Sequence, residues 1–333
     1  MTHSLDEVTP LRWRAAELAD LPEIHSLLTA VSAFDDTTQR WGPEELEEWY
    51  SATGDLASDL IVIGFEGGSM VAVGWNVTET SGTIRLDGAV HPAFRHQGIG
   101  RRLFQWQLDR ARDWFLAFGD APEVCHLAFS DAPMTNKRSM FEHAGLKATR
   151  WLIDMVCQFP LTSRVAEFVV TPVLGVRFEQ FSDRWVEPTR EAHNAAFADR
   201  WGAQPVGPQD WIASLAVEHA RPELSWVAID ELERVVGYAL NSSASEPGGP
   251  SVGWTDRLGV RPEQRGRNIA RVLLARSLDS FRRAGKDAGG VGLDSVDGGG
   301  TTLYRSLGYE PTDTIIQYEL HESREQARAA LDN

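Results

Sequence analysis

The hydrophobic pattern of this chain occurs twice. Apolar runs of strand length alternate with stripes of helical spacing in the first half, and the same order returns in the second. Strands are expected in the first half at 11–14, 60–65, 70–77, 83–90, 124–129 and 151–159. In the second half they are expected at 175–181, 225–229, 235–241, 252–260, 290–295 and 314–320. The alternation predicts the α/β class, with a mixed, mostly antiparallel sheet flanked by helices in each half.

Domain boundaries follow from this repeat. A chain of 333 residues is long for one domain and comfortable for two. We expect a first domain over 1–160, a proline-bearing linker of mixed polarity over 161–174, and a second domain over 175–324. The polar residues 325–333 are expected to form a tail with a frayed helix.

The most informative stretch is the turn that follows one strand in each half. It reads LGVRPEQRGRNIARVLL over 258–274 and VHPAFRHQGIGRRL over 90–103. In both, a strand ends in valine and a turn leads into an amphipathic helix. Such a junction aims unpaired backbone N–H groups and the positive end of the helix dipole at one point, which suits a diphosphate. The Walker and Rossmann glycine patterns are absent, which argues against a nucleoside triphosphate or a dinucleotide.

The two turns match at a constant offset of 170 residues. The hexapeptide from Arg95 to Gly100, RHQGIG, resembles the [QR]-x-x-G-x-[GA] pattern of the GNAT N-acetyltransferases, and the one from Arg265 to Ala270, RGRNIA, differs from it only at Asn268. The resemblance implies two tandem GNAT-like domains and acetyl-CoA as cosubstrate, its pyrophosphate held by the turn. By this resemblance the residues expected to bind the cosubstrate are Leu258, Gly259, Val260, Arg265, Gly266, Arg267, Asn268, Ile269, Ala270 and Arg271, and Gly88, Ala89, Val90, Arg95, His96, Gln97, Gly98, Ile99, Gly100 and Arg101.

The resemblance also implies an acid for the departing thiolate. In GNAT enzymes a tyrosine on the short helix after the fifth strand often has this role. The segment LYRSLGY over 303–309 is similar to the family's L-Y-x-x-x-G-F and puts Tyr304 there, whereas the first half has Phe141, which has no hydroxyl. Catalysis is therefore expected in the second half. The alternative, that Tyr304 only packs, stays open.

Asn268 is an argument against placing the cosubstrate in the second half. It stands where the family has glycine, and its side chain could crowd the phosphates, although asparagine tolerates the left-handed backbone better than most residues. The first half keeps Gly98 and Gly100. Two alternatives therefore stay open for the first domain: it binds CoA without turnover, or it is purely structural.

The acceptor amine must lose a proton before it attacks, so a base is needed. Many GNAT enzymes have a glutamate on the strand before the turn. The only acid on strand 252–260 is Asp256, which we expect to act as the base or to anchor a relay water. The period of two along a strand places positions 254, 256, 258 and 260 on one face. Weaker candidates for the base or for acceptor binding are Asp35, Asp36, His193, Asp199, Glu223, Asp294 and Asp297.

Composition limits the partners. The net charge is −16 and both halves are acidic, which disfavours nucleic acid. No apolar run approaches the roughly 20 residues of a membrane span, and the N-terminus has no signal pattern, so no membrane partner and a cytoplasmic location are expected. Cys125 and Cys157 are expected to be reduced core residues. The sequence contains no CxxC or HExxH motif, so no metal site is expected.

Together these features predict an acetyl-CoA-dependent N-acetyltransferase. A primary amine of a small molecule would attack the thioester directly, without a covalent enzyme intermediate, in a monomer or homodimer. The acceptor itself is not identified. Two alternatives stay open: a catalytically silent acyl-CoA-binding protein, and an aminoacyl transferase of related fold, whose polyanionic tRNA substrate fits poorly with two acidic halves.

Overall fold

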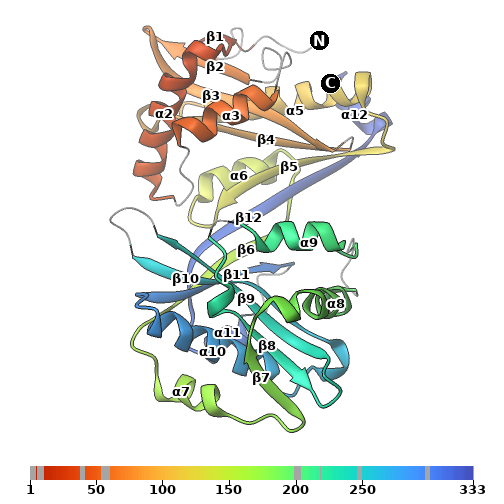
Figure 1. Ribbon diagram of the computed structural model, residues 1–333. Coiled ribbons are helices and arrows are strands. Elements are labelled where there is room, and N and C mark those ends of the chain that lie inside the picture. Colours follow the sequence, from red (N-terminus) through yellow and green to blue (C-terminus); the bar gives the residue numbers. More distant parts are fainter. Residues whose placement is uncertain are drawn as a thin grey trace. The chain divides into compact units, whose positions relative to one another are not determined.

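The computed structural model describes residues 5, 11–37, 42–53, 61–80, 82–198, 204–217, 219–245, 250–296 and 301–332. Contacts divide the chain into two compact units. Unit 1 comprises Met1–Trp151 and Ile315–Asn333, and unit 2 comprises Leu152–Thr314. Each unit has a mixed, mostly antiparallel sheet flanked by helices (Figure 1), which confirms the predicted fold class.

The sheet of unit 1 contains one parallel pairing, between β4 and β5. Its strands, in spatial order, are β1 (Arg12–Ala15), β2 (Ile61–Glu66), β3 (Ser69–Thr80), β4 (Thr83–Val90), β5 (Glu123–Asp131) and the later part of β12 (Glu310–Ser323). The helices of this unit are α2 (Leu21–Asp35), α3 (Pro43–Thr53), α5 (Ile99–Phe118), α6 (Thr135–His143) and α12 (Arg324–Leu331).

Unit 2 repeats this plan. Its strands, in spatial order, are the later part of β6 (Lys147–Gln158), then β11 (Ala288–Ser295), β10 (Ser251–Val260), β9 (Val235–Ser245), β8 (Trp226–Asp230) and β7 (Val176–Gln180). Its helices are α7 (Ser163–Val170), α8 (Val186–Phe197), α9 (Pro208–Leu215), α10 (Ile269–Arg283) and α11 (Thr302–Arg305). Trp211 and Tyr238 belong to the core on the α8 and α9 side of the sheet, and Val272 and Leu273 to the core on the α10 side.

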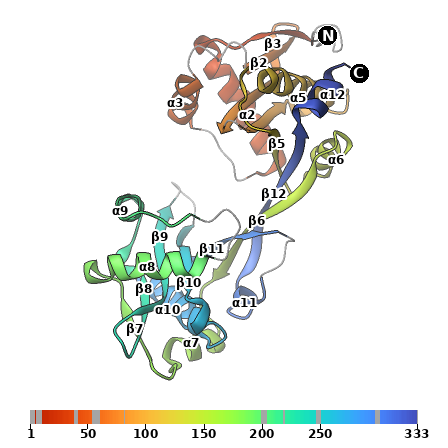
Figure 2. The same ribbon diagram turned by 90° about the vertical axis from the view of Figure 1, so that its right-hand side faces the viewer.

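The last strand of each repeat completes the sheet of the other unit. From Leu152 onward β6 belongs to unit 2 and continues into α7, which packs on α10. From Ile315 onward β12 belongs to unit 1 and continues into α12, which packs on α5 (Figure 2). The boundaries expected at 160 and 324 were therefore wrong. Hydrophobic periodicity locates strands but does not show which sheet each one joins.

The segment expected to be a frayed tail is an anchored helix. Ser323 and Gln326 form a reciprocal capping box at the start of α12, and Ala327 is fully buried. Arg324 donates to the carbonyls of Phe115, Leu116 and Gly119 at the C-terminus of α5, where helical carbonyls lack their regular partners. The segment expected to be a linker contains α7, whose Val165 is fully buried. Both predictions failed because these short helices are stabilised by packing rather than by local propensity.

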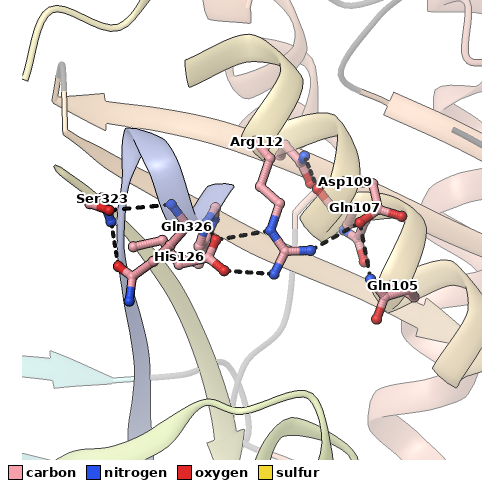
Figure 3. A network of polar contacts seen from close by, with 9 residues as sticks. Gln105, Gln107, Asp109, Arg112, His126, Ser323 and Gln326 are labelled. Carbon is pink, nitrogen blue, oxygen red and sulfur yellow. Dashed lines mark hydrogen bonds and ion pairs between the residues drawn. The ribbon is translucent and has the colours of Figure 1, made fainter. Parts of the chain in front are cut away.

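A buried ionic network joins β12 to the rest of unit 1 (Figure 3). The guanidinium of Arg112 on α5 donates two hydrogen bonds of 2.9 Å to the Glu322 carboxylate, and a third of 3.0 Å to Asp109. The imidazole Nε2 of His126 on β5 lies 2.8 Å from Glu322. Burial alone would raise the pKa of Glu322, but the hydrogen bonds of His126 and Arg112 outweigh it and lower the pKa to about 2.

We predict that Glu322→Gln weakens unit 1. Removing one charge of a buried pair leaves Arg112 poorly compensated, so the free energy that protects β5 and β12 should fall by about 3 kcal/mol at pH 7. Because the pKa of Glu322 is lowered by folding, this stabilisation is complete above about pH 5 and is lost as the pH falls toward 2. Hydrogen exchange of the β5 and β12 amides measures both effects. The exposed Glu325→Gln is the control, and equal protection in both variants would contradict the prediction.

Candidate active site

Two strands of unit 2 separate in the middle of its sheet. The parallel pairing of β10 with β11 covers Val252–Thr255, while the pairing of β10 with β9 continues to Val260. The N–H of Arg261 donates to the carbonyl of Val236 at 2.9 Å. Since hydrogen-bonded pairs alternate along an antiparallel ladder, the N–H of Val260 points away from β9, into the gap that β11 leaves. A backbone donor therefore faces the open wedge between the strands.

A cavity of about 370 Å³ opens beside this wedge. It is lined by Leu258, Gly259 and Val260 of β10, by Ala196 and Phe197 at the end of α8, and by Arg265 and Ala270 of the turn and helix that follow. These are the residues of the second repeated turn together with the end of α8. The Arg265 guanidinium donates to the carbonyl of Ala196 at 2.7 Å, which is a neutral partner, so the positive charge of the arginine is retained at the cavity.

The turn before α10 has two left-handed positions, Gly266 with φ of 78° and Asn268 with φ of 63°. In unit 1 the corresponding positions are His96 with φ of 63° and Gly98 with φ of 81°. Each turn thus has glycine at one of the two positions and a different residue at the other. Asparagine is among the few residues that adopt this conformation readily, so the substitution at 268 leaves the shape of the turn intact.

Backbone donors converge at the start of α10. The N–H of Val272 donates to the carbonyl of Asn268, so the N–H groups of residues 269–271 precede the first helical hydrogen bond and have no partner within the helix. The Asn268 side chain accepts from Arg271 at 2.5 Å, which directs its amide oxygen toward that guanidinium. Arg271 also lies 3.3 Å from the Ser306 hydroxyl next to α11. The helix start therefore offers three N–H groups and nearby positive charge to an anion.

A β-bulge on β10 changes which side chains share a face. The register of β10 with β9 shifts between Thr255 and Arg257, so Asp256 is an extra residue in the ladder. Arg257 lies opposite Leu240 and stacks on Trp211, on the α8 and α9 side. Asp256 accepts a 2.9 Å hydrogen bond from Ser242. Because of the bulge, Leu258 and Val260 pack on the α10 side instead. The expected common face for 254, 256, 258 and 260 was therefore wrong: a bulge interrupts the period of two.

Asp256 and Arg257 line a second cavity, of about 260 Å³. The Asp256 side chain is reached from the surface, yet neighbouring atoms desolvate its carboxylate and raise its pKa. The hydrogen bond of Ser242 and the charges of His219 and Arg257 oppose this rise. A carboxylate with a raised pKa is a stronger base than an ordinary aspartate. The other lining residues are Phe181, Ser214, Leu215, Val217, His219, Ala220, Pro222, Ser225, Leu240 and Asn241.

Tyr304 lies on α11, two residues before Ser306, the residue that Arg271 contacts. Its ring is partly buried and meets the ring of Tyr309 edge to face, with centroids 6.0 Å apart. Tyr309 is fully buried, and burial raises its pKa strongly. Tyr304 on α11 is thus only partly buried, whereas Tyr309, which precedes β12, belongs to the core.

The matching region of unit 1 is built differently. Arg95 is held by Asp35 through two hydrogen bonds of 2.6 and 2.7 Å, so a carboxylate already neutralises the arginine of that turn. The residue at the offset of 170 from Asp256 is Leu86, which is 1% exposed and belongs to the core, and the pairing of β3 with β4 runs through it without a bulge. Phe141 is also core, packed between Phe104 and Tyr318.

The weaker candidates lie elsewhere. Asp35 pairs with Arg95, Asp36 ends α2, and Asp294 is exposed on β11. His193 lies on α8 with its Nδ1 2.6 Å from the Tyr238 hydroxyl, and Glu223 is exposed on the turn before β8. Asp199 and Asp297 lie outside the described residues.

The donor atoms of Cys125, Glu319 and His321 lie within 4.8 Å of one another on β5 and β12 of unit 1. Glu319 accepts hydrogen bonds from His321 and Gln317, which accounts for this grouping without an ion. Cys157 is buried as expected, and Cys125 is partly exposed. Among the described residues, no helix combines the length and apolar character needed to cross a membrane.

Sequence reasoning missed two residues that line the second cavity, Arg257 and His219, and the hydrogen-bond partner of Asp256, Ser242. One signal was present: the consecutive charges at 256 and 257 interrupt the alternation of an otherwise apolar strand, as a bulge does. The contact of Ser242 with Asp256 depends on strand register, and the loop that carries His219 has no sequence motif.

Comparisons with known proteins agree with this duplicated arrangement. The model of the acetyltransferase (GNAT) family matches residues 27–126, and that of an acetyltransferase (GNAT) domain matches residues 221–311. A mycothiol acetyltransferase of Propionibacterium freudenreichii subsp. shermanii is 26% identical over 285 residues, which cover 84% of this chain and 84% of the relative.

Two solved structures share the fold along nearly the whole chain. A GCN5-related N-acetyltransferase from Sphaerobacter thermophilus has a TM-score of 0.71 at 23% identity, covering 94% of this chain and 96% of its own. A tandem GNAT protein from the clavulanic acid biosynthesis pathway has a TM-score of 0.59 at 15% identity, covering 93% and 98%.

The left-handed conformation of Asn268 gives a testable prediction. Asn268→Gly should keep the stability of unit 2 within a few tenths of a kcal/mol, because glycine adopts a positive φ freely. Asn268→Ala should lower the free energy of unfolding by about 1 kcal/mol relative to the glycine variant. Equilibrium denaturation of the two variants measures this difference. Equal stabilities would show that residue 268 is not held in the left-handed region.

Proposed function

This chain is a tandem member of the GNAT acetyltransferase family, and on that premise we propose that unit 2 transfers an acetyl group from acetyl-CoA to the primary amine of a small molecule. The bulge at Asp256 is the observation that carries the proposal. It places a carboxylate of raised pKa on the strand whose next residues face the open wedge and the cavity with Arg265. The base Asp256, the backbone donor of Val260 and Arg265 of the anion site thus lie within ten consecutive residues, on β10 and the turn after it.

The residues of this turn fit a diphosphate. Three N–H groups at the start of α10, the helix dipole and the guanidinium of Arg265 provide positive charge, and the cavity of about 370 Å³ leaves room beside them. When bound, acetyl-CoA supplies the thioester carbonyl that the amine attacks and the thiol that leaves.

The residues of the chain would act in sequence on the reacting atoms. The Asp256 carboxylate takes a proton from the ammonium group, directly or through water, and frees the nitrogen lone pair to attack the carbonyl carbon. The Val260 N–H stabilises the negative charge that develops on the carbonyl oxygen. As the C–S bond breaks, the Tyr304 hydroxyl gives its proton to the sulfur, and the second proton lost from nitrogen restores that hydroxyl through solvent. The products are an amide, a free thiol and one proton released to solvent.

Unit 1 is less suited to the same chemistry. Its arginine is already paired with Asp35, and apolar core residues stand where Asp256 and Tyr304 stand in unit 2. Unit 1 therefore lacks counterparts of the two side chains proposed to transfer protons in unit 2. We propose that unit 1 is structural, and that the CoA-binding role expected for its turn belongs to unit 2 alone.

Arginine substitutions test which turn binds the cosubstrate. Arg265→Ala should weaken acetyl-CoA binding about 10-fold or more in calorimetric titration, because it removes a charged hydrogen-bond donor worth about 1.5–3 kcal/mol. Arg95→Ala, the matched change in unit 1, should leave the affinity and a stoichiometry of one per chain unchanged. A loss of affinity with Arg95→Ala alone would place the site in unit 1.

Substitutions of the acid and the base test catalysis. In an assay of CoA release over a panel of amines, Asp256→Asn and Tyr304→Phe should each lower kcat by about 10²-fold or more, with little change in acetyl-CoA affinity. The wild-type rate should fall as the pH drops through the raised pKa of Asp256, and this acidic limb should be absent in Asp256→Asn. Full activity of Tyr304→Phe would remove the proposed acid, and binding without turnover on any amine would favour a silent CoA-binding protein.

A further inference from the structure

The bulge on β10 brings two opposite charges to the same cavity. Successive residues of a regular strand point to opposite faces, but Asp256 and Arg257 both line the cavity of about 260 Å³ on the α8 and α9 side. An acid and a guanidinium are therefore adjacent in sequence and share one small space. An ordinary strand could not present them in this way.

Arg257 is held in place without a carboxylate partner. Its guanidinium lies over the ring of Trp211, 5.2 Å from the centroid, and Nη1 donates to the Ser214 hydroxyl at 2.9 Å. Trp211 is fully buried, so the surface beneath the guanidinium is fixed. Within the described part of the chain, no carboxylate oxygen lies within the 4.0 Å of an ion pair with Arg257. The planar group thus keeps donors for an anion that arrives with a ligand.

The size of the cavity limits that ligand. A volume of about 260 Å³ lies just below the usual range for ligand sites, which is about 300–1,000 Å³. Apolar walls from Phe181, Leu215 and Leu240 leave space for a short side chain rather than for a sugar chain or a protein surface. A molecule of the size of a single amino acid matches this volume.

We propose that the acceptor is a free amino acid or a close zwitterionic analogue, whose amino group faces Asp256 and whose carboxylate pairs with Arg257. This inference rests on the proposed function and names its substrate class. The carboxylate would bind the planar guanidinium by paired hydrogen bonds, and Trp211 would keep the guanidinium in that orientation. An amine without the carboxylate would leave the guanidinium facing an uncharged group, so the site discriminates against it.

Matched substrate pairs test the proposal. Each of the twenty amino acids is compared with its own carboxamide in the CoA-release assay, at equal concentrations of free amine. For at least one amino acid, kcat/KM should exceed that of the carboxamide by about 10-fold or more, mainly through KM. In Arg257→Gln the amino acid should lose that advantage, so that its kcat/KM equals that of the carboxamide measured with the same variant. The control Arg282→Gln, at the exposed end of α10, should behave as wild type.

A binding measurement separates this inference from the proposed function. The protein is saturated with CoA, and the same amino acid and carboxamide are titrated calorimetrically. Preferential binding of the amino acid that Arg257→Gln abolishes supports the inference even if no turnover occurs, in which case the proposed catalysis fails alone. Turnover of simple amines or carboxamides as efficiently as of every amino acid, or an Arg257→Gln variant that still discriminates, overturns the inference and leaves the acetyltransferase activity standing.

Discussion

The structure depends on the exchange of a strand at the end of each repeat. β12 completes the sheet of unit 1 and β6 that of unit 2, and each continues into a helix packed on the long helix of the sheet it joins. In unit 1 the joint is the buried carboxylate of Glu322, held by Arg112 and His126. Such a charge is costly to bury without both partners. Because each sheet also needs a strand from the other repeat, neither unit is complete as a continuous half of the sequence.

Within this duplicated scaffold the two units have diverged at a few positions. The turns keep the same backbone, with two left-handed residues each, although glycine occupies a different one of the two positions in each copy. The side chains around the turns differ more. Unit 1 pairs its arginine with Asp35 and fills the neighbouring positions with Leu86 and Phe141, whereas unit 2 keeps its arginine beside a cavity. The two copies thus share the fold and the shape of the turn, while the side chains around the turn differ.

The bulge in β10 links the two cavities of unit 2. Before it, β10 pairs with β11; after it, the strand borders the wedge and leads into the turn that precedes α10. One extra residue places Asp256 and Arg257 toward one cavity and leaves Leu258, Gly259 and Val260 lining the other. The proposed base, the oxyanion donor and the anion site are therefore positioned by a single local irregularity in the sheet, and the sheet itself fixes their spacing.

The sequence alone determined the α/β class, the internal repeat, the two turns and the contrast between Tyr304 and Phe141, because periodicity and local motifs depend on neighbouring residues. It did not determine that α12 belongs to unit 1, that Asp35 neutralises Arg95, or that Asp256 and Arg257 share a face. Each of these depends on partners far along the chain or on a one-residue shift in register. The tertiary structure decided them, because strand pairing and burial select contacts that hydrophobic spacing cannot distinguish.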